Sequence, residues 1–168
     1  MTSAWPKLKN LKYLDISGNP ITFIIKGDFK YLDTLEVLKM SHLQKCTKVE
    51  TGAFHNLKAL RTLEMYDLPM VMFMDIRGIL ANFKTLEEVL VDFKETLVGD
   101  HLSPAYSPRL KKLGVKGQKV LNIAIGAFAG KSKHYLIFKS IKVLCKIKVC
   151  MKLGSYRPIF HHLLTYST

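Results

Sequence analysis

The residue types that most often perform catalysis or hold metals are present in this sequence, but their spacing favours neither role. The six histidines are scattered, and the adjacent pair His161-His162 is typical of a solvated tail. Cys145 and Cys150 lack the clustered partner residues that a zinc site needs. The chain has no G-x-S-x-G, phosphate-loop, H-E-x-x-H or Cys-x-x-Cys motif. We therefore expect no catalytic, cofactor-binding or metal-binding residues.

Composition indicates a folded chain without a disulfide framework. The 168 residues are 48% hydrophobic, which is enough for one domain with a sizeable core. The three cysteines are odd in number and spread along the sequence, which favours free thiols. There is no uninterrupted apolar run long enough to span a membrane, and closely spaced lysines interrupt any secretory signal near the start. The chain as written carries neither segment.

The net charge of +13 is distributed unevenly. Residues 1–130 hold 18 Lys/Arg and 13 Asp/Glu, which leaves a net charge of +5. Residues 131–168 hold 8 Lys/Arg and no acid, which leaves +8. A basic total raises the possibility of nucleic acid or anionic lipid as a partner, but the change in composition near residue 130 is the more informative feature.

Apolar residues recur along the chain with a nearly constant period. The first unit reads L-x-x-L-x-x-L-x-L-x-x-N-x-L with a late Phe, from Leu8 to Phe29. Later units start near residues 32, 57, 83 and 107, so the starts are 24, 25, 26 and 24 residues apart. A Gly stands shortly before each late apolar position; these positions are Phe29, Phe54, Leu80, Leu102 and Phe128. Five agreements at one phase indicate a true internal repeat.

Residues 8 to about 130 resemble the leucine-rich repeats, most closely the 24-residue "typical" class with a Phe spine. That class builds the ectodomains of Toll-like receptors, chaoptin-like adhesion proteins and Slit-like ligands. The resemblance implies an α/β-type repeat solenoid, with short parallel strands on a concave face and irregular turns or short helices on a convex face. It also implies a non-catalytic protein-binding module from a cell-surface or secreted receptor or adhesion protein.

The physics of the pattern supports stacking independently of the resemblance. Apolar residues that alternate in L-x-L point to one side of a short strand, and one such strand cannot bury its apolar face alone. Stacked units share a continuous core. The turn after each strand departs from the usual Asn in most units; the residues there are Asn19, Leu43, Leu68, Lys94 and Gln118. We therefore expect irregular turns in units two to four.

The same alternation predicts three rows of side chains that point away from the core. The first row is Tyr13, Val37, Thr62, Glu88 and Lys112; the second is Asp15, Lys39, Glu64, Leu90 and Gly114; the third is Ser17, Ser41, Tyr66, Asp92 and Lys116. Glu64, Glu88 and Asp92 give an acidic middle, and Lys112 and Lys116 a basic end.

A concave sheet is where solenoids usually bind partners, and Tyr is favoured at binding hot spots. The candidate partner-binding residues are Tyr13, Asp15, Lys39, Thr62, Glu64, Tyr66, Glu88, Leu90, Asp92, Lys112 and Lys116. Within this set, the third and fourth repeats are the first choice for a contact. The alternative, a solvated sheet face without a ligand, stays open.

Residues 131–168 break the repeat, because Lys131 and His134 stand where a sixth unit needs apolar residues. Ile141 to Val149 alternates as a strand and could cap the sheet. The basic tail is a cap or membrane-surface element, a nucleic-acid-binding segment, or a non-native terminus. The lack of acids, the abrupt break and the absence of the Cys-rich caps usual in secreted relatives favour the last, and nucleic acid is the least favoured partner. Both ends suggest a fragment.

The main functional hypothesis is therefore a leucine-rich-repeat module, residues 1–130, that binds a protein ligand or receptor. The alternative hypothesis is a basic scaffold that associates with anionic membrane through residues 131–168. The resemblance places the protein outside the cell or at its surface. Loss of liposome binding with salt, and on removal of the tail, would separate the two hypotheses.

Overall fold

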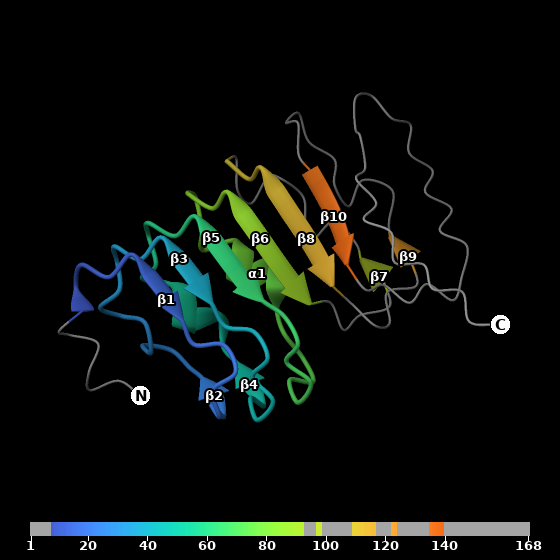
Figure 1. The fold of residues 1–168 in the computed structure, drawn as a ribbon, viewed down its shortest axis with the longest axis horizontal. Helices are drawn as coiled ribbons and strands as arrows, with labels where there is room; N and C mark the ends of the chain where they lie inside the picture. Colours follow the sequence, from blue (N-terminus) through green and yellow to red (C-terminus); the bar gives the residue numbers. More distant parts are fainter. Residues whose placement is uncertain (1–7, 93–96, 99–108, 117–121, 124–134, 140–168) are drawn as a thin grey trace.

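The fold is built on a parallel sheet to which each repeat contributes one strand. A computed structural model describes residues 8–92, 97–98, 109–116, 122–123 and 135–139. Six parallel strands lie side by side in the order β1, β3, β5, β6, β8, β10 (Figure 1). Their bounds are β1 Tyr13–Asp15, β3 Val37–Lys39, β5 Thr62–Met65, β6 Glu88–Asp92, β8 Lys112–Lys116 and β10 Tyr135–Lys139.

The paired strands of the sheet are spaced along the chain in the same way as the apolar repeat units. Paired residues in the first column are Tyr13, Val37, Thr62, Glu88 and Lys112. Their numbers differ by 24, 25, 26 and 24, the same steps as the predicted unit starts. Consecutive strands are therefore joined by one full turn of the solenoid, and every parallel pair has a crossover between its strands.

The core lies behind the sheet and is filled mainly by the periodic leucines. Leu38, Leu63 and Val89 pair in register and are buried. The first residues of units two to four, Leu32, Leu57 and Phe83, are buried as well. Each unit buries its apolar side chains only against the neighbouring units. The stability of a solenoid therefore depends on the contacts between adjacent repeats.

A second line of short strands and helices completes each turn. β2 (Phe23–Ile24) pairs in parallel with β4 (Lys48–Val49), and β7 (Leu97–Val98) with β9 (Asn122–Ile123). The 3₁₀-helix η2 (Thr51–Phe54) and the helix α1 (Ile76–Leu80) contact each other, and α1 lies behind the sheet in Figure 1. The Asp75 carboxylate caps α1 by accepting a hydrogen bond from the Gly78 amide at 2.8 Å.

Three phenylalanines stack through the core. The ring centroids of Phe29 and Phe54 are 5.9 Å apart, and those of Phe54 and Phe83 are 6.2 Å apart in an edge-on arrangement. The repeat pattern assigns the late apolar position of the third unit to Leu80, which is buried in α1. The aromatic stack nevertheless continues through Phe83, the first residue of the fourth unit.

The turns after the first three strands share one backbone feature. Gly18, His42 and Asp67 occupy equivalent positions and have φ values of 71°, 57° and 56°. The Gly18 amide donates to Ser41 O at 2.9 Å, and the His42 amide donates to Tyr66 O at 3.1 Å. Hydrogen bonds thus join the first turn to the second and the second to the third, and the expectation of irregular turns in units two to four stays a prediction.

The strand β10 lies within the residues that the sequence assigns to the basic tail. It pairs in parallel with β8, from Tyr135 opposite Lys112 to Lys139 opposite Lys116. The apolar residues Leu136 and Phe138 pair with Leu113 and Val115, so the sheet extends beyond residue 130. The strand predicted over 141–149 lies outside the described residues, and the boundary at residue 130 stays a prediction.

Candidate functional site

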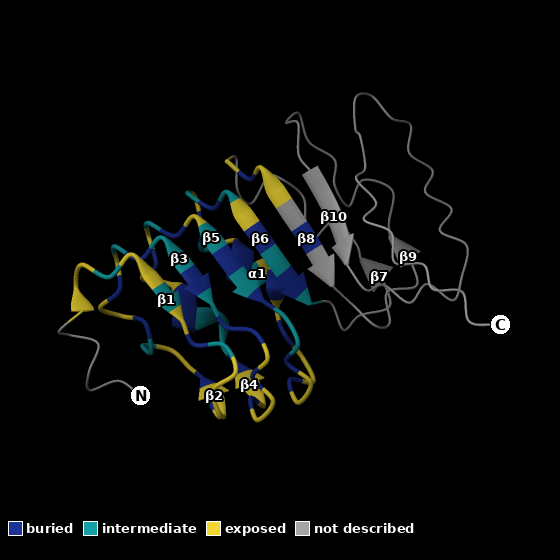
Figure 2. Ribbon diagram, viewed as in Figure 1, coloured by how far each residue is buried: buried dark blue, intermediate teal, exposed yellow. Residues whose placement is uncertain are grey.

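The face of the sheet that points away from the core carries the three predicted rows. Asp15, Lys39, Glu64, Leu90 and Gly114 are paired in sequence across five strands, as the second row requires. Asp92 pairs with Lys116 in the third row. Tyr13 is 51% exposed, and Val37, Thr62 and Leu90 are half-buried. Figure 2 shows exposed and half-buried positions alternating with buried ones along these strands.

Most charges on this face are paired with charges on the neighbouring strand. Lys39 Nζ lies 3.2 Å from Glu64 Oε1, and Lys112 Nζ lies 3.3 Å from Glu88 Oε2. The hydrogen bond to Glu64 raises the pKa of Lys39 above its ordinary value. Ion pairs between repeats therefore neutralise Glu64 and Glu88 of the predicted acidic middle and Lys112 of the predicted basic end.

An apolar spot borders both ion pairs, because Leu90 pairs with Glu64 on β5 and lies two residues along β6 from Glu88. A Cβ atom placed on Gly114 would lie 2.5 Å from Leu90 Cδ1, which shows that the Leu90 side chain covers the glycine. Any larger residue at position 114 would displace Leu90 across the strand. The pair of β6 and β8 thus presents one continuous apolar surface, formed by Leu90 lying on Gly114.

The turns at the ends of β3 and β5 hold a small polar cluster. His42 Nδ1 lies 2.6 Å from Asp67 Oδ2, and the His42 ring packs edge-on against Tyr66 at a centroid distance of 5.2 Å. A His–Asp pair orients the imidazole in hydrolase triads. Ser41 is adjacent, but its Oγ is buried and has no hydrogen-bond partner among the described residues. The sequence places Ser41 in the outward third row, and the structure shows it 2% exposed, so it offers little accessible surface there.

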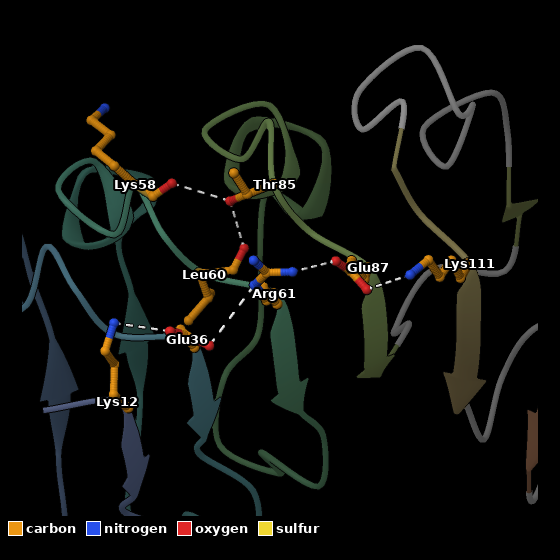
Figure 3. Close-up of polar contacts among 8 residues, drawn as sticks. All are labelled: Lys12, Glu36, Lys58, Leu60, Arg61, Thr85, Glu87 and Lys111. Atoms are coloured by element: carbon orange, nitrogen blue, oxygen red, sulfur yellow. Dashed lines mark hydrogen bonds and ion pairs between the residues drawn. The ribbon is translucent and has the colours of Figure 1, made fainter.

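A ladder of alternating charges runs along the residues that precede the strands, and the sequence analysis did not identify it. The ladder consists of Lys12, Glu36, Arg61, Glu87 and Lys111 (Figure 3). Successive charged atoms lie 2.9, 3.8, 2.8 and 2.7 Å apart. The sequence does contain a pattern that predicts the ladder. Each of these residues stands immediately before a first-row residue, and their charges alternate in sign from one repeat to the next.

The ladder also shifts the titration of its acids. The hydrogen bond from Lys111, followed by the contact with Arg61, holds the pKa of Glu87 below its ordinary value. Lys12 lowers the pKa of Glu36 in the same way. A hydrogen bond between uncharged groups also joins two repeats beside the ladder. The Thr85 hydroxyl donates to Leu60 O of the preceding repeat at 2.7 Å (Figure 3).

Other residues that could bind a metal or act as nucleophiles are dispersed among the described residues. In the part of the chain that the structure describes, no three His, Cys, Asp or Glu side chains gather as metal ligands. Cys46 is a buried free thiol whose pKa is raised by burial. The residues Cys145, Cys150, His161 and His162 lie outside the described ranges. Among the helices described, none has the length and apolar character needed to cross a membrane.

Comparisons with known proteins identify the repeat type. No protein-family model matches the chain. Tsukushi from chicken (Gallus gallus), a leucine-rich-repeat protein, is 39% identical over 59 residues, which are 35% of this chain and 16% of Tsukushi. The structure of human 5T4 (Wnt-activated inhibitory factor 1, trophoblast glycoprotein), a leucine-rich-repeat ectodomain, superimposes with a TM-score of 0.54 at 16% identity.

The superposition on 5T4 covers 78% of this chain and 60% of that chain. This chain therefore spans less than two thirds of either protein. The two similarities and the parallel sheet confirm the leucine-rich-repeat solenoid that the sequence pattern predicts.

Proposed function

We propose that this chain is a non-catalytic module that binds a protein ligand on the outward, concave face of its sheet. The observation that carries the proposal is the continuous register of the first two rows. Residues from separate repeats, such as Asp15, Lys39 and Glu64, become direct neighbours only because the strands pair. Six strands spaced about 4.8 Å apart give a surface roughly 24 Å across, which is wide enough for a protein contact.

The centre of the proposed contact is the apolar surface of Leu90 on Gly114. The Lys39–Glu64 pair lies on the two preceding strands, and the Glu88–Lys112 pair lies on the same two strands, one row away. Interfaces combine an apolar centre with a polar rim, and these two ion pairs would belong to that rim. We infer that the ligand places an apolar side chain against Leu90, with Glu64, Glu88, Tyr66 and Asp92 around it.

We further propose that the parent protein is secreted or displayed at the cell surface, as a receptor or adhesion protein. The similarity to Tsukushi and 5T4 supports an extracellular setting.

The test uses a panel of purified secreted and cell-surface ectodomains, screened for binding to the immobilised full chain. Leu90→Arg and Thr62→Arg place a long charged side chain on the outward face, and each should abolish binding of any captured ectodomain. Met72→Arg is the matched control, since Met72 is 87% exposed and lies off the sheet. Circular dichroism would verify folding of all three variants. Binding that survives both sheet substitutions would contradict the proposal.

A further inference from the structure

Large apolar side chains are exposed along one side of the solenoid, away from the outward face of the sheet. They are Phe23, Ile25, Met70, Met72 and Phe73, and we call this set the lateral ridge. Their exposed fractions are 55%, 43%, 54%, 87% and 75%. At about 200 Å² for each large side chain, they expose roughly 600 Å². Patches of this size on soluble proteins commonly mark an interaction site.

The repeats bring the lateral ridge together. β2 pairs with β4, so Phe23 lies beside Lys48. The next turn, residues 68–75, is held to the second repeat at both ends, by the His42–Asp67 pair and by the packing of α1 on η2. In Figure 1, β2, β4 and the loop after β5 project at the same edge, and Figure 2 shows largely exposed positions there.

Alternation within these turns separates the lateral ridge from the core. Ile24, Val49 and Met74 are buried behind it, whereas Phe23 and Phe73 point outward. A side chain that is three quarters or more exposed projects from the surface and does not line a groove. A projecting apolar side chain can enter a soft apolar medium, such as a bilayer interface, without a matching pocket in a rigid partner.

The charges beside the lateral ridge indicate which kind of partner would cover it. Lys26 and Lys45 are exposed beside the lateral ridge, and neither forms an ion pair with any other described residue. The nearby acids are already engaged: Glu50 pairs with Lys48 at 2.6 Å and accepts a hydrogen bond from the Lys26 amide, and Asp28 accepts one from the Ile25 amide. The whole chain carries a net charge of +13, which opposes association with a second copy and favours an anionic surface.

We propose that the lateral ridge docks on an anionic lipid surface, with Phe73 and Met72 entering the interface and Lys26 and Lys45 contacting the headgroups. Apolar side chains flanked by lysines are the arrangement that holds peripheral proteins at the bilayer interface. The outward face of the sheet is not used, so the contact is independent of the proposed protein ligand and both could be occupied together.

The test measures sedimentation of the full chain with phosphatidylcholine vesicles that contain phosphatidylserine, and with vesicles of phosphatidylcholine alone. The chain should bind the anionic vesicles, and more weakly as salt is added. Phe73→Ser and Met72→Ser should each weaken binding about tenfold, since an apolar side chain no longer enters the interface. Lys26→Gln and Lys45→Gln should each weaken it about fivefold.

Tyr13→Ser is the matched control, because Tyr13 is an exposed aromatic residue on the sheet and should leave vesicle binding unchanged. The serine variants remove side chains that pack little in the folded protein, so folding should be retained and can be verified by circular dichroism. An absence of vesicle binding would overturn the proposal. So would binding that is salt-sensitive but unchanged by Phe73→Ser, which would assign it to lysines elsewhere.

A further measurement separates lipid from a second copy of the chain. Light scattering without vesicles should show a monomer at every concentration used for sedimentation. A dimer that disappears in Phe73→Ser would make the lateral ridge an interface between copies and would overturn the lipid proposal.

Discussion

The stack of Phe29, Phe54 and Phe83 predicts an order of destabilisation for three identical substitutions. Phe54 lies between the other two rings, with centroid distances of 5.9 and 6.2 Å, whereas Phe29 and Phe83 each contact Phe54. All three side chains are essentially buried. Phe→Leu leaves a similar small cavity at each position, so the difference between them reports the aromatic contacts.

One aromatic pair contributes about 1 kcal/mol beyond the area it buries. Phe54→Leu removes two pairs and should therefore lower the free energy of unfolding by about 1 kcal/mol more than Phe29→Leu or Phe83→Leu. For a chain of this size, that difference corresponds to a melting temperature roughly 3 °C lower. Urea unfolding followed by circular dichroism measures the free energies directly.

Double variants sharpen the test. Phe29→Leu combined with Phe83→Leu should be additive, because these two rings do not touch each other in the stack. Phe29→Leu combined with Phe54→Leu should cost about 1 kcal/mol less than the sum of the single variants, since their shared pair is lost only once. If Phe29→Leu proves as costly as Phe54→Leu, the stack is not a chain of pairwise contacts and the reasoning fails.

Two further predictions follow from the glycine positions and from the charge ladder. Gly27→Ala should destabilise the fold by about 1–2 kcal/mol in urea unfolding, because Gly27 has a φ of 92°, whereas Gly52→Ala at the equivalent position should be nearly neutral; equal costs would refute this. The lowered pKa of Glu87 means that Lys111 and Arg61 stabilise the fold above the ordinary carboxyl pKa, and that this contribution is lost as the pH falls through the folded-state value. Glu87→Gln should therefore be less stable than the wild type near neutral pH and should lose less stability on acidification; parallel pH profiles would contradict the ladder.

The register of the sheet could be predicted because the apolar period is imposed by packing. Each Leu of a strand must meet the Leu of the next repeat, so the spacing in the sequence becomes the pairing of residues such as Leu38 with Leu63. The predicted rows follow from that register. Whether these rows bind a protein stays a prediction, because exposure does not identify a ligand.

Other features depend on side-chain geometry that periodicity does not contain. The third unit has more apolar residues than its core can take, and the pattern does not reveal that Met74 is buried while Met72 and Phe73 are exposed. The continuation of the aromatic stack through Phe83 depends on where α1 places the chain. The neutralisation of Glu64 could not be predicted from the sequence, because it depends on the side-chain positions that bring Glu64 and Lys39 together across the sheet.

The charge ladder has a consequence for how such an array can change length. Its signs alternate from one repeat to the next, from Lys12 and Glu36 to Arg61, Glu87 and Lys111. Deleting or duplicating one internal repeat would bring two like charges side by side, at separations where they repel. Deleting or duplicating two adjacent repeats would preserve the alternation. Along this edge, electrostatics therefore favour the gain or loss of repeats in pairs.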